Sequence, residues 1–182
     1  MAAAEYYPIG LYHMKLDLPV IKNQSVRTFY ALYWPQHQIL IDFFSLLPEG
    51  QYDFRMVDTP ERKAESPRES LAHILYVQWV YLNSIKTGKL EFKSMGTEHF
   101  STLPRPQLLA ELERCDQELY AFLTAETFDS SAAVNVPWGS SMNAIDLLFF
   151  LRDHDILHIG WNLAYMDHLN VPRFASLSQY WG

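Results

Sequence analysis

The sequence predicts an all-α protein: an up-down four-helix bundle with an extended N-terminal arm and a short C-terminal tail. Apolar residues recur at the spacing of an amphipathic helix in four long stretches. Loops rich in turn-forming residues separate these stretches, and no stretch shows the sustained two-residue alternation of a β-strand. Four amphipathic helices bury their apolar faces most simply against one another, which favours a bundle.

Composition bounds the class of protein. The chain has 182 residues, enough for one domain with a substantial core, and its 49% hydrophobic and 15% aromatic residues exclude disorder as the default. The net charge of −7 argues against a nucleic acid or an anionic membrane as a partner, since both attract basic surfaces. No apolar run approaches the roughly 20 residues of a membrane span.

The N-terminus and the cysteine content indicate where the protein works. Residues 1–8 lack the basic region and the apolar stretch of a signal peptide. The single cysteine, Cys115, cannot form an internal disulfide. We therefore expect a cytoplasmic protein, in which Cys115 is a small core residue of the third helix.

The arm and the first helix come first in the chain. Residues 1–23 contain Pro8, Gly10 and Pro19 and read as an extended arm, whose aromatic and leucine side chains are expected to pack on the body or on a second subunit (Tyr6, Tyr7, Leu11, Tyr12, Leu16, Leu18). The helical pattern starts at Ser25 and ends at 48–50. Pro35 interrupts it and predicts a kink or a restart of the helix.

The second helix has the clearest start. Ser66, Pro67 and Glu69 form the pattern of a capping box with proline at the first helical position. The helix is predicted to run from Pro67 to about Lys86 and to end at Gly88. Glu69 is interpreted as a capping carboxylate, with orientation of His73, four residues later, as the alternative.

The third and fourth helices follow longer connections. The third is predicted from Pro104 to about Leu123. The fourth is predicted to start near 140–143, where Ser140, Ser141 or Asn143 can cap it, and to end at about Leu169. Asn170 is a plausible left-handed cap. Residues 171–182 are predicted to pack on the surface as a tail, and the bundle itself to span about 25–170.

Two histidines of the fourth helix carry the candidate chemistry. His154 and His158 are four residues apart, so one face of a helix carries both, together with Leu147, Leu151 and Tyr165 and, by the same spacing, Phe150 and Trp161. Such a pair either hydrogen-bonds locally in a core or binds a metal. His73 adds a third imidazole. Three neutral imidazoles would hold a divalent metal and leave positions open for water or substrate.

The ligand type does not select the metal, because zinc, nickel and iron(II) all suit imidazole. A bound metal would lower the pKa of a water or a thiol and supply a nucleophile near neutral pH. Other polar residues could also contribute to the site. His37 is expected to be a satisfied core or interface histidine, with a place in the same cavity as the alternative. Asp153 and Asp155 flank His154 but point away from its face, as supporting or solvated groups.

Three segments resemble the DinB/YfiT-like family of four-helix-bundle metalloproteins. They are LPEGQYDFR at 47–55, SPRESLAHI at 66–74 and DHDILHIG at 153–160, and the similarity spans roughly residues 25–170. The resemblance implies a single DinB-like domain over 1–182, His73, His154 and His158 as the metal ligands, and a homodimer. It also implies varied reactions, among them thiol-dependent transfer and metal-dependent hydrolysis.

One departure bears on the substrate. Members of the family commonly have glutamine after the glycine that follows the histidine pair, and here Trp161 follows Gly160. This aromatic side chain would narrow the pocket or line an apolar substrate site, so the substrate class does not transfer.

Two hypotheses follow. The first is a metal-dependent enzyme, a hydrolase or a thiol-dependent transferase, acting on a small molecule with or without a low-molecular-weight thiol. The second is a non-catalytic dimeric binding protein in which the site is vestigial or holds metal weakly. Neither involves nucleic acid or membrane. The aromatic arm and faces favour a homodimer in both cases.

Overall fold

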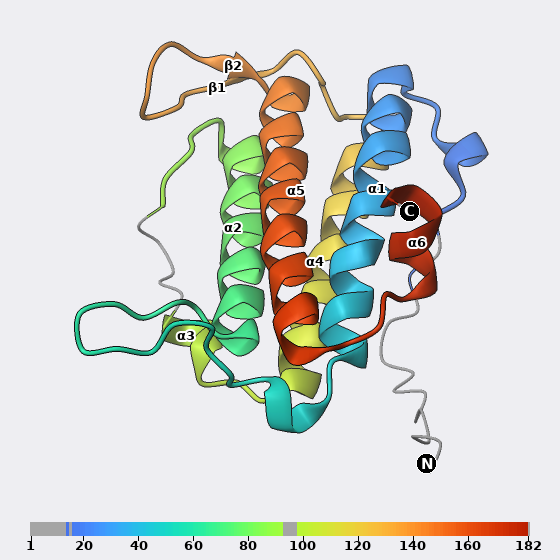
Figure 1. The fold of residues 1–182 in the computed structure, drawn as a ribbon. Helices are drawn as coiled ribbons and strands as arrows, with labels where there is room; N and C mark the ends of the chain where they lie inside the picture. Colours follow the sequence, from blue (N-terminus) through green and yellow to red (C-terminus); the bar gives the residue numbers. More distant parts are fainter. Residues whose placement is uncertain (1–13, 15, 93–97, 182) are drawn as a thin grey trace.

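The computed structural model describes residues 14, 16–92 and 98–181, and these residues are mostly helical, as predicted (Figure 1). The long helices are α1 (Gln24–Leu46), α2 (Pro67–Thr87), α4 (Arg105–Thr124) and α5 (Ala144–Leu169). The structure also has two short α-helices, α3 (Glu98–Ser101) and α6 (Ala175–Trp181), and 3-10 helices at Leu18–Val20 and Glu49–Gln51. The four long helices match the four predicted stretches to within a few residues.

The ends of the helices follow from local chemistry. The Asn23 side chain accepts hydrogen bonds from the amides of Ser25 and Val26 at the start of α1. The predicted capping box of α2 is present, and Gly88 ends this helix with a φ of 74°. Asn170 ends α5 in the left-handed conformation, as predicted. At the start of α5, Asn143 occupies the cap position, but its side chain makes no capping hydrogen bond.

The long helices lie side by side around one apolar core (Figure 1). Helix α1 packs chiefly on α5, and α2 packs on both α4 and α5. Each long helix contributes fully buried side chains, among them Phe29, Leu40, Leu75, Leu112 and Leu147. Cys115 is also fully buried, which confirms it as a core residue. The contact between α2 and α5 places the histidine-bearing stretches next to each other.

Helix α1 does not restart at the proline. It runs from Gln24 to Leu46 as one helix with Pro35 inside. A proline at this place removes one backbone hydrogen bond, yet the residues around it are held by the core: Tyr33 and His37 are completely buried and stack on each other. Tertiary packing therefore outweighs the local signal to break the helix.

Three features were not predicted: helix α3, which lies in the connection before the third long helix, a two-stranded sheet, and a helix in the C-terminal tail. Strands β1 (Ala133–Val134) and β2 (Met142–Asn143) pair antiparallel above the start of α5, and two-residue strands are too short to show alternation (Figure 1). The C-terminal tail is helical: α6 packs on α1, Leu177 is buried, and Trp181 Nε1 donates to Gln36 Oε1 at 3.1 Å. Seven residues hold too little of a helical period to reveal a helix.

The predicted arm falls mostly on residues 1–13 and 15, which lie outside the described residues. Of its apolar side chains, Leu16 and Leu18 pack partly buried against the core. Among the described helices, none combines the length and the hydropathy needed to cross a membrane.

Candidate metal centre

Three histidines from two helices meet at one point. His73 comes from α2, and His154 and His158 come from α5, 81 and more residues later. Nε2 of His154 lies 3.0 Å from Nε2 of His73 and 3.2 Å from Nε2 of His158. One ring nitrogen from each lies within 4.8 Å of the others, and no other group of potential metal ligands of this kind occurs among the described residues. The sequence-predicted triad is thus assembled.

Local structure explains why the rings converge. His154 and His158 are one helical turn apart, so both rings leave α5 in the same direction. His73 lies in the second turn of α2, four residues after the capping carboxylate of Glu69. The capping box fixes where α2 begins and therefore the height at which His73 faces α5.

A serine on α2 orients one of the rings. Ser70 Oγ lies 3.0 Å from Nδ1 of His158, and both residues are buried. When Nδ1–H of His158 donates to this hydroxyl, the lone pair remains on Nε2, which faces His154. Sequence reasoning gave Ser70 no role. Its position about one turn before His73 on the same helix was the sequence signal that could have indicated a role beside the histidines.

The electrostatic environment keeps the α5 histidines uncharged. Burial, followed by the charges of His158 and His73, lowers the pKa of His154 to about 3. Burial, followed by the charge of His73, lowers the pKa of His158 to about 4. Both imidazoles are therefore neutral near pH 7 and have a lone pair to offer a cation.

A polar pocket of about 350 Å³ borders the triad at His73. Its lining is mostly charged and comes from α2, α3 and the loop before α2: Arg55, Lys63, Glu65, Glu69, Ala72, His73, Glu98 and Ser101. The pocket gives a small polar molecule a route to the histidines from outside. Its lining was not predicted, because it depends on how the 52–65 loop folds back.

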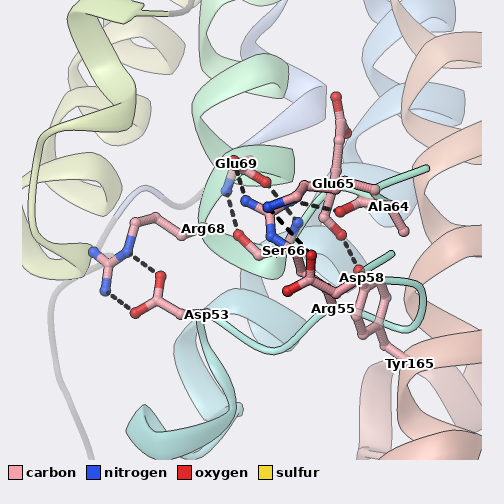
Figure 2. A network of polar contacts seen from close by, with 10 residues as sticks. Asp53, Arg55, Asp58, Ala64, Glu65, Ser66, Arg68, Glu69 and Tyr165 are labelled. Atoms are coloured by element: carbon pink, nitrogen blue, oxygen red, sulfur yellow. Dashed lines mark hydrogen bonds and ion pairs between the residues drawn. The ribbon is translucent and has the colours of Figure 1, made fainter. Parts of the chain in front are cut away.

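Arg55 joins this loop to the start of α2 (Figure 2). Its guanidinium donates to Glu69 Oε1 at 2.5 Å and to the carbonyl oxygen of Ala64 at 2.6 Å. Glu69 also accepts from the amide of Ser66, so the capping carboxylate serves two partners. The hydrogen bond and charge of Arg55 lower the pKa of Glu69. Capping is confirmed as the role of Glu69, and among the described residues no hydrogen bond joins it to His73.

Helix α5 holds the other side of the loop. The Tyr165 hydroxyl donates to the carbonyl oxygen of Glu65 (Figure 2). The ring of Tyr165 is buried and packs edge-on against Phe54. The loop that walls the pocket is therefore attached both to α2 and to α5, the two helices that carry the triad.

His37 does not face the triad. It is completely buried, with Nδ1 2.7 Å from Asp155 Oδ2 and Nε2 3.0 Å from Asp116 Oδ2. Burial lowers its pKa, but the two carboxylates outweigh burial and raise the pKa to about 10. Burial also raises the pKa of Asp155, against the opposing charge of His37. The interpretation of His37 as a satisfied core histidine is confirmed, and Asp155 is a buried partner rather than a solvated residue.

Two aromatic residues assigned to the inward face of α5 are exposed. Leu147, Leu151 and Tyr165 are buried, but Phe150 and Trp161 are 45% and 42% exposed. Their positions lie at the outer edge of the stripe, which the described helices leave exposed. Asp153 is exposed as well and pairs with Arg152. Trp161 is therefore a surface residue near the triad, outside the lining of the polar pocket.

Comparison with known proteins identifies the family. The sequence model that represents the DinB family matches residues 22–175, which is most of the chain.

The chain belongs to the DinB family. A DinB-like protein from Bacillus subtilis has a similar crystal structure, with a TM-score of 0.59, 18% identity and coverage of 84% of this chain and 96% of that one. This similarity shows a shared fold. No curated protein matches the chain. The predicted family is thus confirmed, and the DinB match agrees with the span of the sequence resemblance.

Proposed function

We propose that this protein is a metal-dependent enzyme built on a DinB-type four-helix bundle, with His73, His154 and His158 as the ligands of one divalent metal. The observation that carries the proposal is the convergence of three Nε2 atoms at 3.0 and 3.2 Å. Two nitrogens held at about 2.0–2.1 Å from one ion lie about 3.0–3.4 Å apart, which matches these separations.

The protonation of the rings supports the same proposal. Nε2 of His154 lies close to two other ring nitrogens and holds at most one proton, so it cannot donate a hydrogen bond to both. A cation shared by three neutral imidazoles satisfies all three inward lone pairs at once.

Three protein ligands leave coordination positions open, the pattern of a catalytic rather than a structural site. A metal bound there would lower the pKa of water or a thiol and so supply a nucleophile for hydrolysis or group transfer. The chain's own residues orient the ligands and admit the substrate: Ser70 fixes the ring of His158, and the pocket beside His73 receives the polar end of a small molecule.

Metal analysis tests the proposal. Protein purified without a histidine tag is expected to contain a divalent metal, zinc, nickel or iron, near one equivalent, or to bind one added equivalent. His158→Ala is expected to abolish this binding. His168→Ala is the matched control, because His168 lies on the same helix and stacks on Phe54 instead. Absence of binding by the wild type, or equal binding by both variants, contradicts the proposal.

A second copy of the chain is the partner that α5 favours. The exposed face of this helix carries Phe150, Leu157 and Trp161, of which Leu157 is 61% exposed. An antiparallel pairing of two α5 helices about Leu157 sets Phe150 opposite Ala164, a large side chain against a small one. It also sets Asp146 opposite His168. This face is thus complementary to itself in shape and charge, as a two-fold dimer requires. The same surface would serve the alternative function, a dimeric binding protein with a weak metal site.

A further inference from the structure

A polar cluster crosses the core beside the triad and takes one or more side chains from each long helix. His37 from α1 lies between Asp116 of α4 and Asp155 of α5. Gln78 of α2 donates to the other oxygen of Asp116. All four residues are buried, with exposed fractions of 2% or less. Nothing in the proposed chemistry uses them, and the cluster does not contact the pocket.

The cluster lies next to the ligands along both helices. Asp155 directly follows His154, and Gln78 lies five residues after His73. Successive residues of a helix point about 100° apart, so Asp155 faces α1 and α4 while His154 faces α2. Each of the two ligand-bearing helices therefore carries a ligand and, within about one and a half turns, a member of the cluster.

Directional bonds distinguish helix registers better than apolar contacts do. A shift of one residue moves a helix by about 1.5 Å and turns it by about 100°, which would break bonds of 2.7 and 3.0 Å. Apolar cores tolerate repacking and lose uniqueness before they lose stability. Buried polar groups are costly but can specify one register among several. A metal triad needs this accuracy, because ligands must be held within about 0.5 Å.

We propose that His37, Gln78, Asp116 and Asp155 are positioning residues that set the register of α5 against α2 and so bring His154 and His158 to His73. The proposal rests on the proposed metal site. It assigns the cluster a role in metal affinity that is separable from its contribution to stability.

The test compares two kinds of core variant. The apolar variant H37L/Q78L/D116A/D155A removes every member of the cluster and keeps the total side-chain volume close to the original. Replacing a whole buried ionic group in this way is often neutral for stability, so the variant is expected to fold. Leu123→Ala is the control: it removes buried packing in the last turn of α4, a helix that supplies none of the three histidines.

The readouts are the affinity for Co²⁺ alone and its visible absorption spectrum, measured well below the melting temperature of each variant. The apolar variant is expected to bind Co²⁺ about tenfold or more weakly, with a changed spectrum, since supporting residues of metal sites contribute factors of about 10–100. Leu123→Ala is expected to melt earlier and yet to keep wild-type affinity and spectrum. A folded apolar variant with wild-type affinity overturns the proposal. So does a Leu123→Ala protein that loses affinity in proportion to its stability.

A second variant decides the matter if the first does not fold. Asp116→Asn preserves the shape of the side chain but removes the negative charge that faces His37. Asp116 lies on α4, which supplies no ligand. The variant is expected to weaken Co²⁺ binding by a smaller factor, and unchanged affinity and spectrum overturn the proposal. If the wild-type protein binds no cobalt, zinc or nickel, the proposed function itself is contradicted. If the wild type and all variants bind metal equally, only the positioning role of the cluster is contradicted.

Discussion

Ser70 shows how one hydroxyl can matter to a site without touching a metal. Its Oγ lies 3.0 Å from Nδ1 of His158. When Nδ1–H donates to this oxygen, Nε2 is left free and rotation of the ring is limited. This contact joins α2 directly to α5, in addition to the contact between His73 and His154.

Ser70→Ala is therefore expected to weaken the binding of Zn²⁺ or Co²⁺ by about 10–100-fold while the protein stays folded. Isothermal titration calorimetry measures the affinity. Ser84→Ala is a close control, since Ser84 is a buried serine of the same helix whose hydroxyl donates only to the backbone of Tyr81. An equal loss in both variants would mean that α2, rather than the Ser70 hydroxyl, is responsible.

Single residues also show what the sequence could reveal. The spacing of His154 and His158 predicted that both rings leave one face of a helix, because helical periodicity decides which way side chains point. The family resemblance then implied that His73 joins them, and the three rings do lie together. Ser70 and Arg55 escaped prediction because their partners, His158 and Glu69, become neighbours only through packing of the helices or folding of the loop. Phe150 and Trp161 were misplaced because periodicity gives the direction of a side chain but not whether another element covers it.

At the scale of elements, the four long helices were predictable from their apolar periodicity, and two of them, α2 and α5, also begin or end on a strong local signal. Such signals are the capping box at Ser66, Gly88 and Asn170. The elements that were missed, α3, β1, β2 and α6, are short and owe their structure to contacts with the long helices. The continuity of α1 through Pro35 has the same origin, since core packing overrides local preference.

The helix contacts through His37 make stability depend on pH. Three groups face this ring: Asp116 of α4, Asp155 of α5 and the hydroxyl of Tyr33 in α1. The pKa of His37 is about 10 in the folded protein against an ordinary value of 6.5. A raised folded-state pKa stabilises fully below pH 6.5, and this contribution is lost as the pH rises towards 10.

The metal-free wild type is accordingly expected to lose stability to urea between pH 6.5 and 10. Each unit of pKa difference corresponds to about 1.4 kcal/mol, so the loss is a substantial part of the total. The apolar variant H37L/Q78L/D116A/D155A is expected to lack this part of the decline. Parallel curves for the two proteins would show that His37 is not charged in the fold.

At the scale of the whole molecule, α5 has apolar residues on every side, an unusual property for a helix at the surface of a monomer. A helix of this kind is normally buried all round. Here the body covers one side, with Leu148 and Met166 in the core, and leaves Leu157 and Trp161 exposed on the other. A second copy of the chain would complete the burial of α5.

Leu157→Asp is expected to convert a dimer into a monomer, because it places two carboxylates at the two-fold axis of the proposed interface. Size-exclusion chromatography with light scattering measures the mass, and circular dichroism checks that the helices remain. Leu32→Asp is a suitable control on α1, since Leu32 is 47% exposed and lies away from this face. A wild-type monomer at all concentrations would contradict the dimer.

The triad can form only after both of the helices that supply its histidines have been synthesised. His73 and His154 are separated by 81 residues, and His154 lies on α5, which is synthesised after α2. Contacts between distant residues form late, after loop closure has been achieved. A nascent chain that still lacks α5 holds a single histidine of the three. If the triad binds metal as proposed, tight binding requires that α5 has been synthesised and has packed on α2, so metal uptake would report that these two helices have come together.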